Sequence, residues 1–172
     1  MKKLTKSTLC IMDIQTGEVR KVKTFDRLIE APNWMQSDDD VLIYNSGGCI
    51  WKYRISEDAE EMIPSGMCTN CNNDHVLSGD NKQLAVSHSD TGWMSQIYIL
   101  PIEGGAPRLI TANARSYLHG WSPDGKELAY VEGRCRLMVL DIESGKTRQI
   151  TDGSQHYSTT GHMDYSWSPD GK

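Results

Sequence analysis

The sequence predicts an all-β fold, a β-propeller of four-stranded antiparallel blades, each about 40–46 residues long. Three observations lead to this prediction. A Ser-Pro-Asp-Gly turn occurs twice, related turn sequences recur at similar spacing, and the same order of apolar runs follows them. The runs are not separated by segments with the periodicity of an amphipathic helix. Four short strands in a unit of this length are typical of a propeller blade.

The repeat can be aligned on a turn serine. This serine falls at Ser37, Ser78, Ser122 and Ser168, so that successive turns lie 41, 44 and 46 residues apart. In the Ser-Pro-Asp-Gly form, the serine hydroxyl can bond back to the backbone, proline fixes φ at the second position, and glycine adopts a left-handed conformation. Each turn therefore predicts a hairpin between the first two strands of a blade.

Two strand-forming runs follow each of the first three turns. The first runs are VLIYN, QLAVSH and ELAYV, and the second runs are CIWKYRI, SQIYIL and RLMVLDI. A polar turn (SEDAE, EGGAP or ESGKT) then leads to a short final strand. With the strand that precedes the turn serine, each unit contains the four strands of a blade.

The two ends of the chain predict parts of blades. We expect residues 1–30 to hold two outer strands, and residues 162–172 to hold an inner strand and its turn. Three complete blades lie between them, at residues 31–64, 72–112 and 117–152. Three blades cannot close a ring, so we expect a partial ring from a longer propeller, with open blade edges that allow self-association.

The composition is that of an ordinary globular domain, with 172 residues, of which 38% are hydrophobic and 24% charged. A net charge of −5 argues against nucleic acid as a main partner. No apolar run approaches the roughly 20 residues that a spanning helix requires. The N-terminus also lacks the continuous apolar core of a signal peptide. We therefore expect a cytoplasmic protein without membrane insertion, whose five cysteines are reduced thiols.

Four segments of the chain are distinctive: EAPNW, CNNDHVLSGDNKQLAVSH, YILPIEGGAPRLIT and YLHGWSPDGKELAY. These segments closely resemble TolB-like propeller repeats of the WD40-like class, in the stand-alone form common in bacteria. The last stretch of the chain is similar to the propellers of tricorn-type peptidases. The resemblance implies a ring that binds proteins or peptides, or that gates a separate catalytic domain. TolB itself is exported and works with a peptidoglycan-associated partner, whereas this chain shows no signal sequence.

The first strand of each propeller blade lines the central channel, and the entry residues of these strands predict a site. Counting three and four residues back from the turn serine gives one pair in each unit. These pairs are Trp34 and Asn33, His75 and Asp74, His119 and Leu118, and Tyr165 and Asp164. Converging imidazole and carboxylate groups can bind a divalent metal or a polar ligand. The candidate ligand-binding residues are Asn33, Asp74, His75, His119 and Asp164, with His75 and His119 as candidate metal ligands. Alternatively, these side chains cap inner strands and bond to neighbouring backbone.

Two further groups of residues have a spacing or position that could serve a function. Cys68 and Cys71 have the spacing of half a zinc site, but no second cysteine pair or histidine pair follows. We expect them to be ordinary thiols in a loop before the second inner strand. Trp34, Trp121 and Trp167 lie close upstream of their turn serines, and we expect them to pack between blades.

The sequence favours a non-catalytic scaffold that binds a protein, a peptide or a small polar ligand at the channel face. No nucleophile elbow or other catalytic constellation is recognisable. Two enzymatic alternatives stay open. One is the gating propeller of a serine peptidase of the prolyl-oligopeptidase or tricorn type. The other is a metal-dependent enzyme similar to oligogalacturonate lyases, in which a divalent metal held by His75 and His119 would acidify a proton of a uronic acid.

Overall fold

The computed structural model describes residues 5–92, 94–133, 136–151 and 165–171. All regular structure in these ranges is β, so the predicted all-β class is confirmed. The strands are β1 (Ser7–Met12), β2 (Val19–Phe25), β3 (Glu30–Met35), β4 (Asp38–Ser46), β5 (Cys49–Arg54), β6 (Ala59–Met62), β7 (Cys71–Leu77), β8 (Gln83–His88), β9 (Gln96–Pro101), β10 (Arg108–Leu109), β11 (Ser116–Trp121), β12 (Glu127–Glu132), β13 (Arg136–Asp141) and β14 (Thr147–Gln149). Within the described ranges, no helix could cross a membrane.

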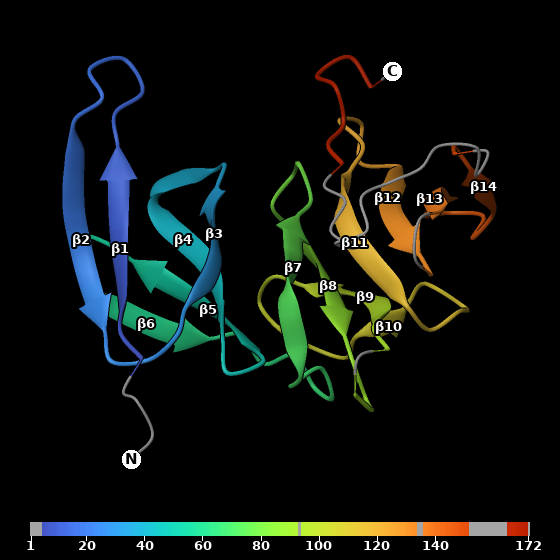
Figure 1. Cartoon of the computed structure of the whole chain (residues 1–172), viewed down its shortest axis with the longest axis horizontal. Helices are drawn as coiled ribbons and strands as arrows, with labels where there is room; N and C mark the ends of the chain where they lie inside the picture. Colours follow the sequence, from blue (N-terminus) through green and yellow to red (C-terminus); the bar gives the residue numbers. More distant parts are fainter. Residues whose placement is uncertain (1–4, 93, 134–135, 152–164, 172) are drawn as a thin grey trace.

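The strands form three four-stranded antiparallel sheets and one two-stranded sheet. Strands β3–β6 make the first blade, β7–β10 the second and β11–β14 the third, each in chain order. β1 and β2 pair with each other as the N-terminal hairpin. Strand β7 contacts both β3 and β11, so the first strands of successive blades lie side by side (Figure 1). The predicted blades are therefore present, and they are arranged as part of a ring.

The hydrophobic core is divided into layers between neighbouring sheets. Along a strand, successive side chains point to opposite faces. In β8, Leu84 and Val86 join the layer shared with the first blade, whereas Ala85 joins the layer shared with the third. A third layer joins the N-terminal hairpin to the first blade, and it includes Phe25 and Tyr44. The first and second blades thus have apolar layers on both faces, and the third blade packs against the second.

The serine turns of the second and third blades have the predicted hydrogen bonds. Ser122 Oγ accepts a bond from Glu127 N at 2.9 Å and donates to Asp124 Oδ1 at 2.7 Å. Gly125 has a φ of 70°, the left-handed conformation that glycine adopts without strain. In the second blade, Asn81 takes this conformation with a φ of 57°. Asparagine is among the residues that tolerate it best.

The first blade has a shorter turn than the alignment on Ser37 predicts. Met35 pairs directly with Asp38, so only two residues connect β3 and β4. As a result, the strand register is shifted relative to the turn serine. Trp34 pairs with Leu42, and its counterparts are Leu77, paired with Leu84, and Trp121, paired with Leu128. The counting from Ser37 is therefore wrong by two residues in this blade.

A charged network fastens the N-terminal hairpin to the first blade. Lys23 Nζ on β2 lies 2.6 Å from Asp58 Oδ1 and 3.0 Å from Glu60 Oε1 on the first blade. Arg27 also pairs with Glu60, and the Tyr44 hydroxyl donates to Glu60 Oε2 at 3.1 Å. Glu60 thus receives hydrogen bonds from three side chains, two of them from the hairpin and the segment that follows it.

Candidate functional site

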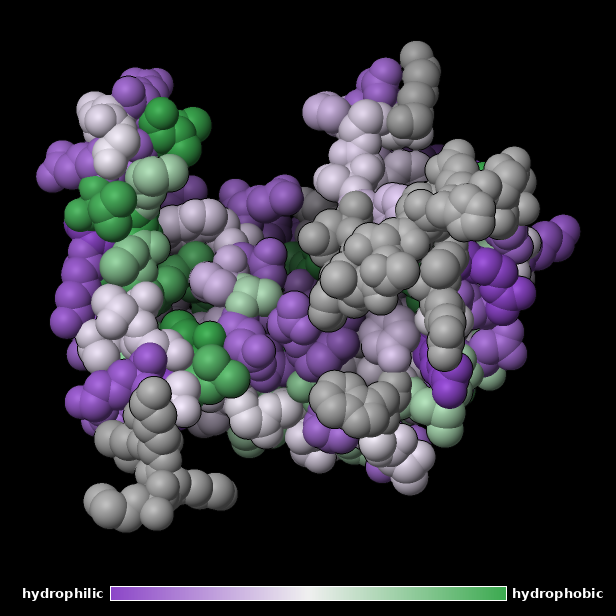
Figure 2. All heavy atoms as spheres, viewed as in Figure 1, coloured by the Kyte–Doolittle hydropathy of each residue, from purple (hydrophilic) through white to green (hydrophobic). Residues whose placement is uncertain are grey.

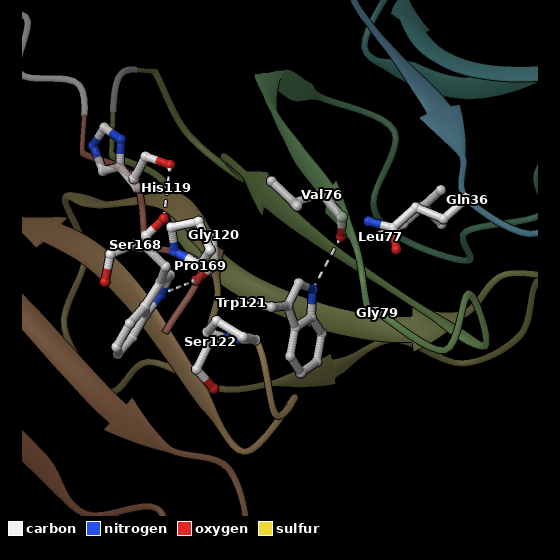
Figure 3. Close-up of a pocket in the computed structure, with 13 residues that line it drawn as sticks. Gln36, Val76, Leu77, Gly79, His119, Gly120, Trp121, Ser122, Ser168 and Pro169 are labelled. Carbon is white, nitrogen blue, oxygen red and sulfur yellow. Dashed lines mark hydrogen bonds between the residues drawn. The ribbon is translucent and has the colours of Figure 1, made fainter. Parts of the chain in front are cut away.

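A groove of about 430 Å³ lies between the ends of neighbouring inner strands and their turns (Figure 3). It is lined by Gln36 and by residues 76–77, 79, 119–123 and 166–169, and we call it the inner-strand groove. The second blade contributes β7, the third blade contributes β11, and the stretch after residue 164 closes the far side. Residues from three successive repeats therefore meet in one hollow.

Two tryptophans fix the walls of the inner-strand groove. The Trp121 indole Nε1 donates to the carbonyl oxygen of Val76 at 3.1 Å, as Figure 3 shows. The Trp167 indole Nε1 donates in the same way to the carbonyl oxygen of Gly120 at 3.3 Å. Each bond joins one inner strand to the inner strand of the preceding blade. Because the bonds hold the indoles in place, they present preformed apolar surfaces beside polar backbone groups.

His119 borders the groove from a β-bulge. Leu118 pairs with Tyr130 and Gly120 pairs with Ala129, so His119 is the extra residue between two paired positions. A bulge of this kind redirects a side chain without ending the strand. The His119 Nδ1 atom accepts a hydrogen bond from the backbone N–H of Tyr165 at 3.4 Å. The two rings also meet edge to face, with centroids 5.5 Å apart. His119 thus connects the third blade to the next inner strand.

His75 lies in the core and does not share the setting of His119. It pairs with Val86 and occupies the position that Leu118 holds in the third blade. Its side chain is buried, with 2% of its surface exposed, and neither ring nitrogen makes a hydrogen bond to any residue that the structure describes. Burial lowers the pKa of His75 to about 4, although nearby backbone groups oppose that shift. His75 is therefore a neutral core residue, and its expected equivalence to His119 is wrong because the bulge moves His119 out of register.

Asn33 and Asp74 make local contacts. Asn33 Nδ2 donates to the carbonyl oxygens of Ala31 and His75, at 2.9 and 3.2 Å, and so connects the first two blades. The half-buried Asp74 accepts a hydrogen bond from Asn72 Nδ2 at 2.7 Å. The contacts of Asn33 match the alternative in which such side chains bond to neighbouring backbone. Asp164, the fifth candidate, lies outside the described residues.

Neither the histidines nor the cysteines form a metal centre in the described residues. In those ranges, no group of three or more His, Cys, Asp or Glu side chains could hold a metal ion. Cys68 and Cys71 are buried, and burial raises their pKa values to about 11 and about 12. Both are therefore protonated thiols at neutral pH. Cys71 is also the first residue of β7, which corrects the expected loop position for this cysteine.

Trp34 departs from the expectation that the tryptophans pack between blades. Trp121 and Trp167 bridge inner strands, whereas 44% of the Trp34 surface is exposed. Sequence reasoning also missed His88, which is buried and accepts a hydrogen bond at Nδ1 from Asn70 N at 3.3 Å. Its Nε2 lies 2.9 Å from Asp90 Oδ1. The short His-x-Asp spacing was the available signal for this pair.

Comparison with known proteins shows which proteins have a similar sequence and architecture. No protein-family model matches the chain. The chain is 39% identical over 171 residues to the uncharacterized protein Atu1656 of Agrobacterium fabrum, and the match covers 97% of this chain and 56% of that protein. A solved structure of a candidate TolB from Agrobacterium tumefaciens has a TM-score of 0.85 and 38% identity, covering 95% of this chain and 58% of the other. The chain is a TolB-like propeller in fold.

More distant structures agree with this TolB-like propeller fold. TolB from Acinetobacter baumannii has a TM-score of 0.75 and 20% identity, covering 96% of this chain and 41% of the other. An oligogalacturonate lyase in complex with manganese has a TM-score of 0.66 and 17% identity, covering 94% of this chain and 48% of the other. At such identities the likeness shows the fold alone. The TolB-like propeller spans little more than half the length of the relatives that it matches at nearly 40% identity.

Proposed function

We propose that this TolB-like propeller is a non-catalytic scaffold that binds a protein or peptide, or a small polar ligand, in the inner-strand groove. The observation that carries this proposal is the pair of indoles, Trp121 and Trp167, held in the groove walls by bonds to Val76 and Gly120. Rigid aromatic surfaces next to a few fixed polar groups are characteristic of binding sites. The stiff blades keep these groups in place before a ligand arrives.

The chemistry of the groove favours an uncharged stretch of ligand. The lining contains indole, proline and glycine surfaces together with the Gln36 amide, serine hydroxyls and the His119 imidazole. No Asp, Glu, Lys or Arg is among the described lining residues. A charged group placed here would lose its hydration without gaining an ionic partner. We therefore infer that the bound segment is an apolar or neutral polar part of a protein or peptide.

The enzymatic alternatives have less support. A metal-dependent reaction on a uronic acid was expected to use His75 and His119, but His75 is enclosed in the core and His119 contacts Tyr165. The described residues thus do not offer a metal site. For a gating propeller of a peptidase, the described residues supply no feature beyond the shared fold. Self-association through open blade edges remains a further proposal for the partners of this chain.

A substitution that fills the groove tests the proposed function. Gly79 has no positive φ, and a Cβ built there meets nothing closer than Pro123 O at 4.0 Å. Gly79→Phe should therefore place a ring in the groove without backbone strain. A displayed random peptide library would be selected against the wild-type chain, and the selected peptides measured by calorimetry. We expect at least tenfold weaker binding to Gly79→Phe, because the ring occupies the ligand's volume.

The matched control is Lys146→Phe, which adds the same ring on the exposed outer turn of the third blade. This variant should bind the selected peptides as the wild type does. Circular dichroism spectra establish that both variants are folded. Equal binding by Gly79→Phe and wild type would refute the groove as the site, and so would a selection that enriches no peptide.

A further inference from the structure

The serine turns of successive units differ at one position that borders the inner-strand groove. The residue directly after the turn serine is Pro123 in the third blade and Pro169 in the next unit, but it is Gly79 in the second blade. All three residues line the groove. The turn of the second blade therefore lacks a ring that the other two turns carry.

The turn has the same structure with proline or with glycine at this position. Ser78 Oγ donates to Asp80 Oδ1 at 2.7 Å, as Ser122 Oγ donates to Asp124 Oδ1 at 2.7 Å. In both turns the backbone N–H three residues after the serine donates to the serine carbonyl oxygen, at 2.8 and 2.9 Å. The φ of Gly79 is outside the left-handed region. The backbone does not require glycine here, so the two kinds of turn differ in the volume of one side chain.

The junction between the third blade and the next unit shows what occupies this place when the ring is present. There, the Pro123 ring lies against the following turn, because a Cβ built on Gly171 would be 3.6 Å from Pro123 Cδ. Gly125 is the equivalent of Gly171 in the third blade, since each lies three residues after its turn serine. A Cβ built on Gly125 would have no described atom within 4 Å. The place that a pyrrolidine ring fills at one junction is therefore open at the junction between the second and third blades.

The open place lies next to an immobilised indole. Trp121 and Gly79 both line the groove, and Figure 3 shows them on neighbouring sides of it. The Trp121 N–H already donates to the carbonyl oxygen of Val76, so the indole offers its ring surface to a ligand. Grooves lined by aromatic rings bind proline-rich segments, whose polyproline II conformation is formed before binding and costs little entropy. Proline also carries no charge, which matches the uncharged side chains of the described lining.

The turns can be reached from one side of the molecule. Gly79 and Pro123 are exposed. The serine turns of the second and third blades point to the same side in Figure 1, and Figure 2 shows a notch in the surface on that side, between the N-terminal hairpin and residues 165–171. An extended peptide can therefore approach the groove without a change in the blades.

We propose that the inner-strand groove binds a proline-containing segment of a protein or peptide in the polyproline II conformation. One proline of the ligand places its ring between the β7–β8 turn at Gly79 and the Trp121 indole, and so supplies the ring that the second blade lacks. The residue at position 79 sets this preference, because a ring carried by the protein itself would exclude the ring of the ligand. The inference rests on the proposed function, since it names the ligand class of the same groove.

The test gives the second turn the proline of the other two. The probe is a fluorescently labelled decaproline peptide, and a decamer of alternating glycine and serine is the comparison peptide. By fluorescence anisotropy, the wild-type chain should bind decaproline more tightly than the comparison peptide. Gly79→Pro should weaken decaproline binding by on the order of tenfold or more, because its ring takes the place of a ligand ring. Proline in a compatible turn also restricts the unfolded chain, so the melting temperature should not fall.

Ile14→Pro is the matched control, because it adds the same ring in an exposed turn whose residues do not line the groove. Asp13 Oδ1 accepts hydrogen bonds from the backbone N–H groups of Gln15 and Thr16, both at 2.8 Å. Ile14 is thus the first residue of a capped turn, a position that accepts proline. This variant should bind decaproline as the wild type does. Circular dichroism and thermal unfolding check that both variants are folded.

A second measurement does not depend on a variant of the protein. Peptides selected from the random library against the wild-type chain should be enriched in proline. Replacing a proline of a selected peptide by alanine should weaken its binding to the wild type by on the order of tenfold for the proline that occupies the groove. Selected peptides without proline would overturn the inference, and so would peptides in which every proline can be replaced without loss.

The outcomes separate the ligand class from the proposed function. If selected peptides bind and Gly79→Phe blocks them, but decaproline binds no better than the comparison peptide, the groove stands and the proline ligand is overturned. Equal decaproline binding by Gly79→Pro and wild type overturns the place assigned beside Gly79. An equal loss in Ile14→Pro also overturns it, because the effect would then not come from the groove. If neither the library nor decaproline yields binding, the proposed function fails as well.

Discussion

The indole N–H of Trp121 donates to the carbonyl oxygen of Val76, 3.1 Å away, and this bond connects the inner strands of the second and third blades. The bond lies beside an apolar layer that contains Leu118 and Leu128, and Trp121 packs against that layer. Apolar contacts are non-directional, so they do not by themselves fix the position of one inner strand relative to the next. A hydrogen bond between the two strands does fix it.

Trp121→Phe should lower the free energy of unfolding by about 1 kcal/mol, because the partly buried carbonyl of Val76 loses its donor. Urea unfolding followed by circular dichroism measures the change. Trp34→Phe serves as the comparison, since the indole of Trp34 is 44% exposed and makes no hydrogen bond to any described residue. If both variants lost the same stability, the bond to Val76 would have no part in holding the blades.

His75→Leu should stabilise the protein by about 1–2 kcal/mol at neutral pH, because it removes two buried ring nitrogens that make no hydrogen bond within the described part of the chain. The third blade already carries leucine at this position, as Leu118. The reciprocal change, Leu118→His, should destabilise the protein by a similar amount. Thermal and urea unfolding of both variants would check the pair. A loss of stability in His75→Leu would mean that the imidazole makes an essential contact.

The same histidine predicts sensitivity to acid. Burial lowers the pKa of His75 from its ordinary 6.5 to about 4 in the folded protein. Below pH 6.5 the unfolded chain therefore binds a proton that the folded chain does not, and stability falls as the pH drops toward 4. The slope from this residue is at most about 1.4 kcal/mol per pH unit. The free energy of unfolding, plotted against pH between 7 and 4, should change less for His75→Leu than for wild type. Equal slopes for the two proteins would contradict the assignment.

Glu60→Gln should loosen the N-terminal hairpin while leaving the second and third blades intact. Hydrogen bonds from Arg27, Lys23 and Tyr44 hold the pKa of Glu60 below its usual value, even though burial acts in the opposite direction. Neutralising this carboxylate removes the anion that Arg27 and Lys23 share, and because these side chains are partly exposed the loss costs about 1 kcal/mol. Hydrogen exchange of β1 and β2 amides should become faster. Glu61→Gln, an exposed neighbour, is the control and should leave these rates unchanged.

The cysteines should differ sharply in reactivity. Cys10 is exposed, whereas burial raises the pKa values of Cys68 and Cys71 to about 11 and about 12. At pH 8, iodoacetamide followed by peptide mass spectrometry should show modification of Cys10 and none of Cys68 or Cys71. The same reagent in urea should modify all three. Modification of Cys68 or Cys71 in the folded protein would indicate that the start of β7 opens readily.

The blades could be predicted from the sequence because their signals are local. Alternating apolar runs indicate strands. A Ser-x-Asp turn followed by Gly125 or Asn81 indicates a hairpin with a residue in the left-handed conformation. The register of the first blade could not be predicted in this way. Ser37 looks like the other turn serines, but it lies in a two-residue turn, and the length of that turn decides the pairing of Trp34.

The candidate site was predicted less well, for a related reason. His75 and His119 lie at equal distances from their turn serines, yet one side chain is in the core and the other borders the groove. The difference comes from the bulge at His119, which depends on how two strands pair and leaves no mark in residue spacing. The bonds from Trp121 and Trp167 were equally hidden, because their acceptors are backbone carbonyls far away in sequence.

The layered core also restricts how such a chain can evolve. Ile43 and Val86 share the layer between the first two blades, whereas the small Ala85 and the large Tyr130 share the next one. In each layer, the two neighbouring blades therefore contribute different shares of the side-chain volume. A blade duplicated into another place would meet a neighbour of the wrong size and leave a void or an overlap. Although the blades share one repeat pattern, their order along the chain is not interchangeable.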